Sequence, residues 1–573
     1  MFKAILSSLC VLLIATASHA APTLNTSAGS PTFSLPGDQE DWSNPLTKYK
    51  YRRVGNRVWT VNCQGAAPGG PPPDFQNIQA AISNTNLRAG DSIWVLGSRC
   101  DGNVDWSSSI SGTATKPIVL TGAFEGEAPV VAPASTSLAS VLKVNKSYWI
   151  ISNLNVTANG ARGEAHPVYI GGSPVQRVLI SDVKVQRSAA GAGLLVGSGA
   201  SYIKVRRSRS FNHVKTILTS VSQPYMTKAT CEGANVSKHL LWGHDGKCGE
   251  RDDAHGFFVD NGASNISFND IAASNVSGDG LQCGTTPEER GSATAPFNVY
   301  VDGFHANGRE KGENALDIKQ CSNVSLLNGE FTEFRPTKNA NSIGEAIVVH
   351  NIATRVKIHG NHISRSCVGI EISGDSKEVV ISNNEIFNLN PMLTDCKSDG
   401  IVLVSGDNFD VHNNTFADAK GSAMAVGAYH LANYVSDVDV WNNIFSASNR
   451  LYMSVAWDDY TQGWGYGVSN FESTYNLFGT SSFPKPFRCV DSKSVNFNFY
   501  ETDLAGWQQC AGAGSDPTPP SKVQGSSQIF MGAGIYNYQL LPTSPAVNAG
   551  FGSPPAGHCG GATWDMGANE YCP

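Results

Sequence analysis

The segment 255-HGFFVD-260 sets a pattern that returns six more times before residue 428. A small residue follows the first position, and apolar residues then alternate with variable ones. The other copies are 279-DGLQCG-284, 314-NALDIK-319, 345-EAIVVH-350, 368-VGIEIS-373, 399-DGIVLV-404 and 422-SAMAVG-427. Subtracting successive first-residue numbers gives intervals of 24, 35, 31, 23, 31 and 23. A period near 23 with occasional longer intervals indicates a solenoid whose coils carry loop insertions.

The alternation within each copy predicts a short strand with one buried face. The third and fifth residues point into the core, and the fourth and sixth point outward. Stacked coils then present outward residues as rows. One row is Gln282, Asp317, Val348 and Glu371, the next is Asp260, Gly284, Lys319 and His350, and the row before the strands is His255, Asp279, Asn314 and Glu345. The row that contains Asp317 and Glu371 continues with the apolar residues Val402 and Ala425. We therefore expect a functional site on the earlier coils.

The composition agrees with a turn-rich β protein and excludes some functions. The chain has 573 residues, of which 58 are glycine and only 16% are charged. A helical protein of this size usually carries more charge and less glycine. The net charge of −7 gives no basic footprint for nucleic acid. It does not exclude an acidic substrate, because a local basic cleft can still form.

Residues 1–20 are typical of a secretory signal peptide. Lys3 supplies the positive charge, Leu9 to Ile14 form a short apolar core, and Ser18-His19-Ala20 is a small-x-small cleavage site. The apolar run is too short to span a bilayer. We therefore expect a secreted protein, extracellular or periplasmic, that makes no membrane contact.

The cysteine count fits an oxidising compartment. The chain has 13 cysteines, and removal of the signal peptide takes Cys10 and leaves 12. An even number in an exported protein predicts disulfides, but the sequence does not give their connectivity. Cys231 with Cys248 and Cys559 with Cys572 are candidate pairs.

The mature chain divides into a lead-in at 21–73 and a long domain at 74–573 that ends in a loop-rich region. The lead-in is rich in Pro, Gly and Ser and contains an expected strand at 57–62. Asp74 is the expected N-cap of a short helix with Phe75, Ile78, Ala81 and Ile82 on one face. A helix with a single apolar face suits the open end of a solenoid.

Both ends of this domain resemble secreted right-handed parallel β-helix proteins, among which polysaccharide lyases are prominent. At the start, Gly90-Asp91 introduces a strand, and 111-SGTA-114 precedes Pro117-Ile118. At the far end stand 503-DLAGW-507, 544-SPAVNAG-550 and 565-DMGANEY-571. The resemblance implies an all-β, right-handed parallel β-helix solenoid with an N-terminal capping helix. The fold alone does not specify a reaction.

Asparagine pairs and insertions complete the solenoid pattern. The pairs 383–384, 413–414 and 442–443 each follow an expected strand. Asparagine tolerates left-handed turns and can stack along a solenoid. Longer insertions at about 219–254 and 285–296 flank the polar rows, and a third lies at about 388–398, which suggests walls of a binding cleft.

Lys319 is the principal catalytic candidate. A neutral lysine can remove the C5 proton of a uronic acid in a β-elimination. A cation must then neutralise the substrate carboxylate, because negative charge develops beside it. The alternative is that Lys319 only pairs with its outward neighbour Asp317.

The layout around Lys319 resembles that of the family-nine pectate lyases. There, an Asp-Gly strand holds calcium, and a lysine follows about 40 residues later; here Asp279-Gly280 precedes Lys319 by 40. The resemblance implies that Asp279 binds Ca2+ and that Lys319 is the base. The family's other ligand positions hold His255, Gly278 and Gln282 in this chain. The acidic residues that can replace them are Asp252, Asp253, Glu313 and Glu345.

Other residues offer alternative chemistry. His255 and His350 can act as acid or base near neutral pH, although a lone outward histidine is commonly a surface residue. Asp317 with Glu371, or with Asp279, can form the carboxylate pair of a glycoside hydrolase, although stacked acids also occur as solvated rows.

Substrate contacts are predicted from charge and aromatic character. Lys204 and Arg206 alternate outward on one expected strand and can hold uronate carboxylates, or they can be a solvated basic strand. Glu371 is a further expected substrate contact. Trp457, with Tyr460 and Trp464 nearby, can stack on sugar rings or pack a loop.

These observations favour a monomeric, exported lyase that cleaves an acidic, uronic-acid-containing polysaccharide by β-elimination, with Ca2+ as its expected cofactor. Hydrolysis and C5-epimerisation are the alternative reactions on this fold. A non-catalytic glycan-binding surface protein is the alternative class.

Overall fold

The structure is a computed structural model of the 573-residue chain. It describes residues 31, 33, 57–66, 71–123, 127–133, 140–158, 166–172, 174–188, 191–213, 215–217, 240–242, 248–291, 293–308, 312–335, 343–389, 396, 398–427, 434–446, 451–456, 467–479, 485, 487–491, 498–502, 507, 522–524, 529–532, 537–550 and 565–568. The predicted signal peptide and most of the predicted lead-in lie outside these ranges.

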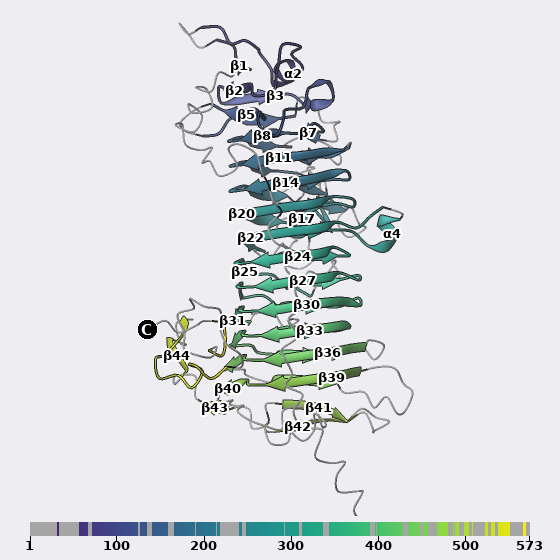
Figure 1. The fold of residues 1–573 in the computed structure, drawn as a ribbon, viewed down its shortest axis with the longest axis vertical. Coiled ribbons are helices and arrows are strands. Elements are labelled where there is room, and N and C mark those ends of the chain that lie inside the picture. Colours follow the sequence, from purple (N-terminus) through teal and green to yellow (C-terminus); the bar gives the residue numbers. More distant parts are fainter. Residues whose placement is uncertain are drawn as a thin grey trace, which may run out of the picture.

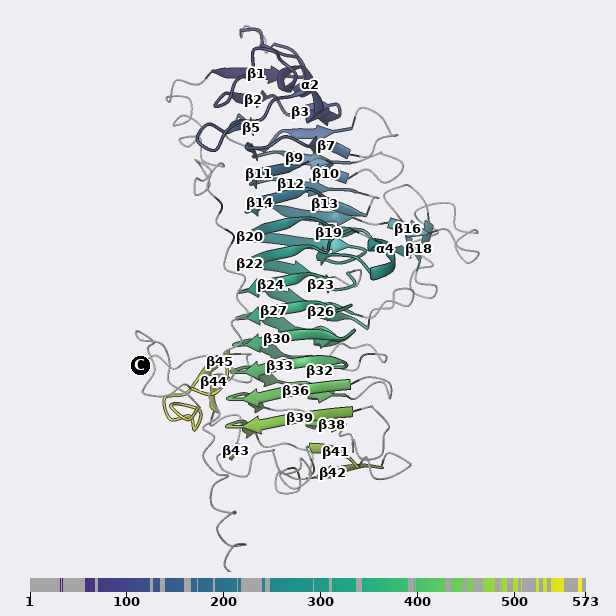
Figure 2. The ribbon, with the colours of Figure 1, turned by 45° about the vertical axis from the view of Figure 1, so that its right-hand side comes forward.

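The strands form two long sheets along one elongated body (Figures 1 and 2). The smaller sheet holds β4 (Val104–Asp105), β7 (Ser140–Val144), β10 (His166–Ile170), β13 (Ala192–Val196), β19 (His255–Val259), β21 (Leu281–Cys283), β23 (Leu316–Lys319), β26 (Glu345–His350), β29 (Val368–Ile372), β32 (Asp399–Leu403), β35 (Ser422–Val426), β38 (Leu451–Ala456), β41 (Phe487–Asp491) and β42 (Asn498–Thr502).

The larger sheet wraps around the other side of the body. It holds β1 (Val58–Asn62), β2 (Ser92–Leu96), β3 (Arg99–Asp101), β5 (Ile118–Gly122), β6 (Val130–Ala132), β8 (Trp149–Ser152), β9 (Asn155–Thr157), β11 (Val175–Ser181), β12 (Lys184–Gln186), β14 (Ala200–Arg206), β15 (Arg209–His213), β20 (Ser264–Val276), β22 (Phe297–Asn307), β24 (Ser322–Leu327), β25 (Glu330–Thr332), β27 (Thr354–His359), β28 (His362–Ser364), β30 (Ser376–Ser382), β31 (Glu385–Phe387), β33 (Gly406–His412), β34 (Thr415–Ala417), β36 (Tyr434–Trp441), β37 (Ile444–Ser446), β39 (Gly467–Thr474), β40 (Leu477–Gly479) and β43 (Lys522–Gln524).

Each regular coil contributes one strand to the smaller sheet and two to the larger one. In one coil these are β26, β27 and β28, and they pair in parallel with β29, β30 and β31 of the next coil. In β20 and β22 the two strands of the larger sheet are continuous. The fold is therefore the predicted right-handed parallel β-helix.

The register of the smaller sheet follows the sequence pattern. Leu281, Leu316, Ile347, Ile370 and Ile401 pair from strand to strand and are all fully buried. Their outward neighbours form the row Phe258, Gln282, Asp317, Val348, Glu371, Val402 and Ala425. The predicted interior column is confirmed, and with it the placement of the polar rows on one sheet face.

The asparagine pairs have the predicted structural role. The first member of each pair, as in Asn383, has a positive φ of 53–55° at a corner between two strands. The second members are fully buried and stack through side-chain hydrogen bonds of 2.9–3.0 Å, in a ladder through Asn361, Asn384, Asn414, Asn443 and Asn476. Each side-chain amide therefore has a hydrogen-bond partner on the neighbouring coil, which allows these polar corners to lie inside the core.

A short helix, α2 (Ile78–Ile82), packs at the first coil (Figure 1). Its predicted apolar residues Ile78, Ala81 and Ile82 are buried, but its N-cap is Asn77. Asp74, the expected N-cap, instead accepts hydrogen bonds from the backbone N and the Oγ1 of Thr60, which hold it beside β1. Because β1 pairs in parallel with β2, the solenoid begins inside the predicted lead-in, before residue 74.

Insertions extend from the smaller sheet near its centre. One contains an antiparallel sheet of β16 (Lys215–Ile217), β17 (Leu240–Trp242) and β18 (Cys248–Asp252). Another contains the short helix α4 (Pro287–Arg290), which begins with a capping box formed by Thr286 and Glu289. A 3-10 turn, η1 (Trp106–Ser108), lies near the N-terminal end, and none of the helices in the described ranges is long and apolar enough to span a bilayer.

Near the far end, a hairpin of β44 (Phe530–Gly532) and β45 (Asn537–Leu540) packs beside the larger sheet (Figures 1 and 2). The described residues include three disulfides, Cys63–Cys100, Cys283–Cys321 and Cys367–Cys396. Each joins cysteines 29 to 38 residues apart. The two candidate pairs from the sequence involve residues outside the described ranges.

Candidate functional site

Three ionisable side chains meet on the outward face of the smaller sheet. Asp317 lies at the centre of this cluster, with Lys319 Nζ 2.9 Å from its Oδ2 and His350 Nε2 2.7 Å from its Oδ1. The Asp317 side chain is 6% exposed, whereas those of Lys319 and His350 are 19% and 25% exposed. The carboxylate is thus enclosed by its two partners, and the partners face the solvent. We call these three residues the Asp317 cluster.

Strand register explains why the cluster forms. Asp317 and Lys319 are two residues apart on β23, so both side chains point outward. His350 lies on β26 directly beside Lys319. A parallel strand spacing of about 4.8 Å lets both longer side chains reach the shorter aspartate.

The neighbouring coil is fixed tightly against this strand. A disulfide joins Cys283 at the end of β21 to Cys321, two residues after Lys319. Gly284 has a φ of +80°, and a Cβ there would lie 1.9 Å from the carbonyl oxygen of Lys319. Only glycine fits this approach, and both features hold the backbone of Lys319 in place.

Asp317 and its two salt-bridge partners stabilise each other's charged forms. Burial by itself raises the pKa of Asp317, but the charges and hydrogen bonds of His350 and Lys319 outweigh it and lower the pKa to about 2. For Lys319, burial lowers the pKa, but the charges of Asp317, Asp279 and Glu313 raise it well above its usual value. In the free protein Lys319 is therefore a cation, which disfavours its predicted role as a neutral base.

His350 has the properties of an oriented base. Burial lowers its pKa, but the charge and hydrogen bond of Asp317 outweigh this and raise the pKa above its usual value. Because Asp317 is ionised and only accepts, Nε2 of His350 donates to it. Nδ1 has no hydrogen-bond partner among the described residues. A neutral His350 therefore presents Nδ1 as an unshared acceptor.

A second polar row lies beside the cluster, at the start of the strands. His255 Nδ1 accepts a hydrogen bond from the backbone N–H of Asp279 at 3.0 Å and lies 3.1 Å from its Oδ2. Asn314 donates to Asp279 Oδ1 at 2.9 Å. The side chains of His255 and Asp279 are only 8% and 1% exposed. These residues pack against one another, while the Asp317 cluster offers the more accessible atoms.

The predicted calcium ligands do not form a common site in the described part of the chain. There, no group of three or more His, Cys, Asp or Glu side chains is placed to hold a metal ion. Asp279 is buried and its Oδ1 already accepts from Asn314, Glu345 is buried, and Asp253 is exposed before β19. Calcium binding stays a prediction.

The remaining candidates lie apart from the cluster. Glu371 is on the same outward row, two strands beyond Asp317. Lys204 and Arg206 are on β14 of the larger sheet, so the structure does not bring them to the cluster. Arg206 is also 5% exposed and donates to Ser181 Oγ on the neighbouring strand, so its predicted outward exposure is wrong. Trp457 lies outside the described residues.

Sequence reasoning placed His350 and Asn314 in the polar rows but missed their partners. The signals were present: His350 shares a row with Lys319, and Asn314 follows Asp279 in the row before the strands. What the rows do not give is side-chain direction along the strand, which brings His350 diagonally to Asp317.

Comparison with known proteins agrees with the fold. A family model described as the right-handed beta helix region matches residues 299–478. A search of curated proteins finds no match.

Solved structures similar to the chain have diverse activities. The pectate lyase Pel9A is 14% identical, with 91% of this chain and 98% of that chain covered and a TM-score of 0.39. The Azotobacter vinelandii mannuronan C-5 epimerase AlgE4 A-module is 12% identical, with 80% and 100% covered and a TM-score of 0.42. PfbA, a surface adhesin of Streptococcus pneumoniae, is 11% identical, with 77% and 95% covered and a TM-score of 0.40. Likeness at this level does not identify a reaction.

Proposed function

We propose that the protein is a secreted enzyme that cleaves a uronic-acid-containing polysaccharide by β-elimination at the Asp317 cluster. The observation that carries the proposal is the carboxylate of Asp317, which holds a lysine cation and a histidine side by side on one sheet face. Disulfides within the described chain support an oxidising, extracytoplasmic compartment.

The reaction needs a base and a nearby cation. Removal of the proton at C5 of a uronate builds negative charge on the adjacent carboxylate. The C4–O bond then breaks as the C4–C5 double bond forms, and the leaving oxygen takes up a proton from solvent and becomes the hydroxyl of the released chain. A positioned base typically contributes about 10²–10⁴-fold to such a step. A cation placed against the developing charge lowers the barrier further.

We assign the base to His350 and the cation to Lys319. Asp317 accepts from Nε2 of His350, which orients the ring and leaves Nδ1 to take the C5 proton. Lys319 donates one N–H to Asp317 and has no other hydrogen-bond partner among the described residues. Two N–H groups therefore remain for a substrate carboxylate. This division differs from the sequence-based assignment of Lys319 as the base, because the surrounding carboxylates favour its charged form.

The same geometry is less suited to glycoside hydrolysis. A hydrolase needs a carboxylic acid that is still protonated near the working pH. Asp317 has a pKa of about 2, and Asp279 is buried and accepts from Asn314. Asp410 has a pKa raised to about 7 by burial, but it lies on the larger sheet and accepts from Trp441. C5-epimerisation begins with the same proton removal, and the product distinguishes it.

A substrate screen tests the proposal. Purified protein is incubated with pectate, alginate and glycosaminoglycans, with and without a chelator, and both ultraviolet absorbance and product mass are followed. Elimination creates an unsaturated sugar that absorbs, whereas hydrolysis adds water and epimerisation leaves the chain length unchanged. Chain cleavage without absorbance would overturn the proposed reaction, and loss of activity on chelation would support the predicted calcium.

A further inference from the structure

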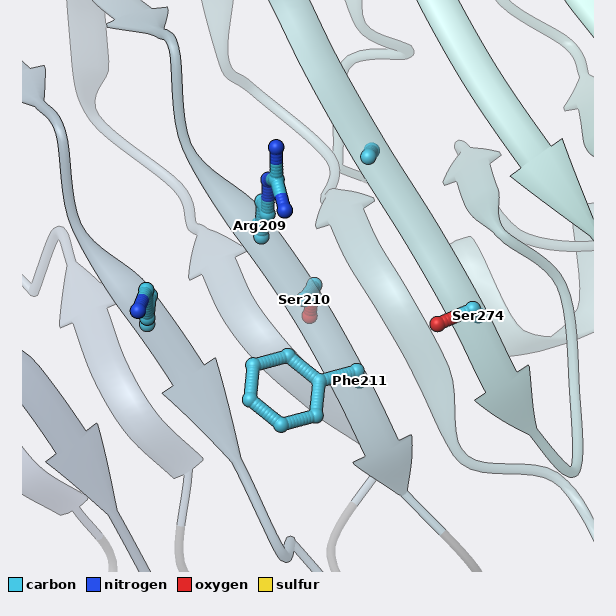
Figure 3. A pocket seen from close by; sticks show the side chains of 6 residues that line it. Arg209, Ser210, Phe211 and Ser274 are labelled. Carbon is cyan, nitrogen blue, oxygen red and sulfur yellow. The ribbon is translucent and has the colours of Figure 1, made fainter.

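A separate pocket lies on the larger sheet, on coils that precede the Asp317 cluster. Its volume is about 320 Å³. It is lined by Lys184 of β12, by Arg209, Ser210 and Phe211 of β15, and by Ala272 and Ser274 of β20. Figure 3 shows Arg209 and Phe211 on one strand, with Ser274 on the next strand facing them.

The register of the three strands creates the hollow. Lys184, Arg209 and Ala272 are direct neighbours in one outward row, and Phe211 is beside Ser274 in the next. The Ala272 side chain is only a methyl group. The row therefore becomes lower immediately after the long side chains of Lys184 and Arg209. The floor is the backbone around Ser210, whose side chain points inward and bonds to Gly256 O.

The two cations of this pocket are not neutralised by the described chain. Both Lys184 and Arg209 are exposed, and neither makes an ion pair with any described residue. Beyond Ala272 the same row continues with His305 and Glu330. The Glu330 carboxylate is the first in this direction, and its Oε2 lies 3.2 Å from His305 Nδ1. A protein with a net charge of −7 thus has, beside an aromatic ring, a local pair of cations that no described carboxylate neutralises.

We propose that this pocket is a second, non-catalytic binding site for a uronate unit of an acidic saccharide. The guanidinium of Arg209 and the ammonium of Lys184 bind the carboxylate. The ring of Phe211 packs against the apolar face of the sugar, and the Ser274 hydroxyl bonds to a sugar hydroxyl. Two neighbouring rungs about 4.8 Å apart let the two cations reach one carboxylate or those of adjacent units.

This site lies in a different sheet from the Asp317 cluster, so it can hold the polymer without occupying the reacting position. Two linked contacts on one polysaccharide raise the effective concentration of the chain at the enzyme. The inference concerns binding and stands whether or not the cluster catalyses elimination.

Calorimetric titration tests this site directly. The Lys319→Ala protein, used to suppress turnover, is titrated with hexagalacturonate, hexamannuronate, cellohexaose and a sulfated carrageenan hexasaccharide. We expect binding of at least one hexauronate that weakens by about tenfold or more when Lys184→Ala and Arg209→Ala are added. Phe211→Ala should weaken it as well.

A matched control removes two other exposed cations from the same sheet, Arg355→Ala with Lys377→Ala. The two double variants have the same net charge. A general charge effect would therefore weaken binding in both, whereas we expect only the variant with Lys184→Ala and Arg209→Ala to lose uronate binding. Three results would overturn the proposal: equal losses of uronate binding in the two double variants, binding of cellohexaose as strong as that of the hexauronates, or no binding of either hexauronate by the Lys319→Ala protein. Stronger binding of the carrageenan than of both uronates would overturn the choice of carboxylate over sulfate.

Discussion

Asp317 links the charge states of the three groups in the cluster. Its carboxylate bonds to Lys319 and His350 at once, so a change in any member alters the pKa of the others. The charged groups that act on His350 are Asp317, Lys319 and Asp279. This arrangement gives a pH signature that a solvated surface row would lack.

Activity should rise with pH through the pKa of His350. The base must lose its proton before it can accept one, and Asp317 raises the pKa of His350 above its usual value of 6.5. We expect kcat/KM to fall as the pH falls below an inflection that lies above 6.5, measured on the substrate that the screen identifies.

Two substitutions should move this inflection in opposite directions. Asp317→Asn removes the negative charge that raises the pKa of His350, so the inflection should move to lower pH. Lys319→Ala removes a positive charge that lowers it, so the inflection should move to higher pH. An inflection that stays in place in both variants would contradict the assignment of His350.

Lys319→Arg separates the two possible roles of the lysine. If Lys319 is the cation, arginine preserves the charge and should retain more activity than Lys319→Ala, which we expect to lose about 10²–10³-fold. If Lys319 is the base, both variants should be equally inactive, because guanidinium does not release its proton. The measurement is kcat for both variants, with thermal unfolding to confirm folding.

Much of this site could be predicted from residue positions. Asp317 and Lys319 are two residues apart on a strand, and His350 follows from the register. The rise in the pKa of Lys319 could not be predicted, because it depends on how closely Asp317, Asp279 and Glu313 lie around its ammonium. The burial of Arg206 also could not, because its contact with Ser181 arises between coils.

At the scale of the strand, the interior column carries the fold. Leu316 is fully buried between Leu281 and Ile347. Leu316→Ala should reduce the free energy of unfolding by roughly 2–5 kcal/mol. Leu327→Ala, at the half-buried end of β24, is the control and should cost clearly less. Denaturant unfolding compares them, and equal costs would contradict the interior assignment.

The elements themselves were predictable to different degrees. Alternation and Asn pairs predicted the strands and corners, because period 2 and left-handed turns are local properties. The start of the solenoid was not predictable from composition, because β1 joins the sheet through pairing with β2. The N-cap of α2 moved to Asn77, because Asp74 finds partners on Thr60.

At the scale of the whole molecule, export and oxidation are testable together. Mature protein from native culture medium or periplasm should begin near Ala21, with most of its 12 remaining cysteines paired. Intact-mass measurement with and without reduction and alkylation gives both values. Mostly free thiols, or an uncleaved residue 1–20 segment, would contradict a secreted location.

The two long sheets give the molecule two distinct polar faces. The Asp317 cluster lies on the smaller sheet and the cationic pocket on the larger one. A solenoid allows this separation because each strand presents its own outward row at a fixed spacing. We therefore expect substitutions at the two proposed sites to alter binding and chemistry independently.

The most direct test of the central claim is the rate at which ultraviolet-absorbing product appears from the preferred polyuronide. The parent protein should produce it, and His350→Ala should do so about 10²–10⁴ times more slowly while remaining folded. His362→Ala, an exposed histidine on the larger sheet, should match the parent. Equal rates for the parent and His350→Ala, or polyuronide cleavage without absorbance, would contradict elimination at this cluster.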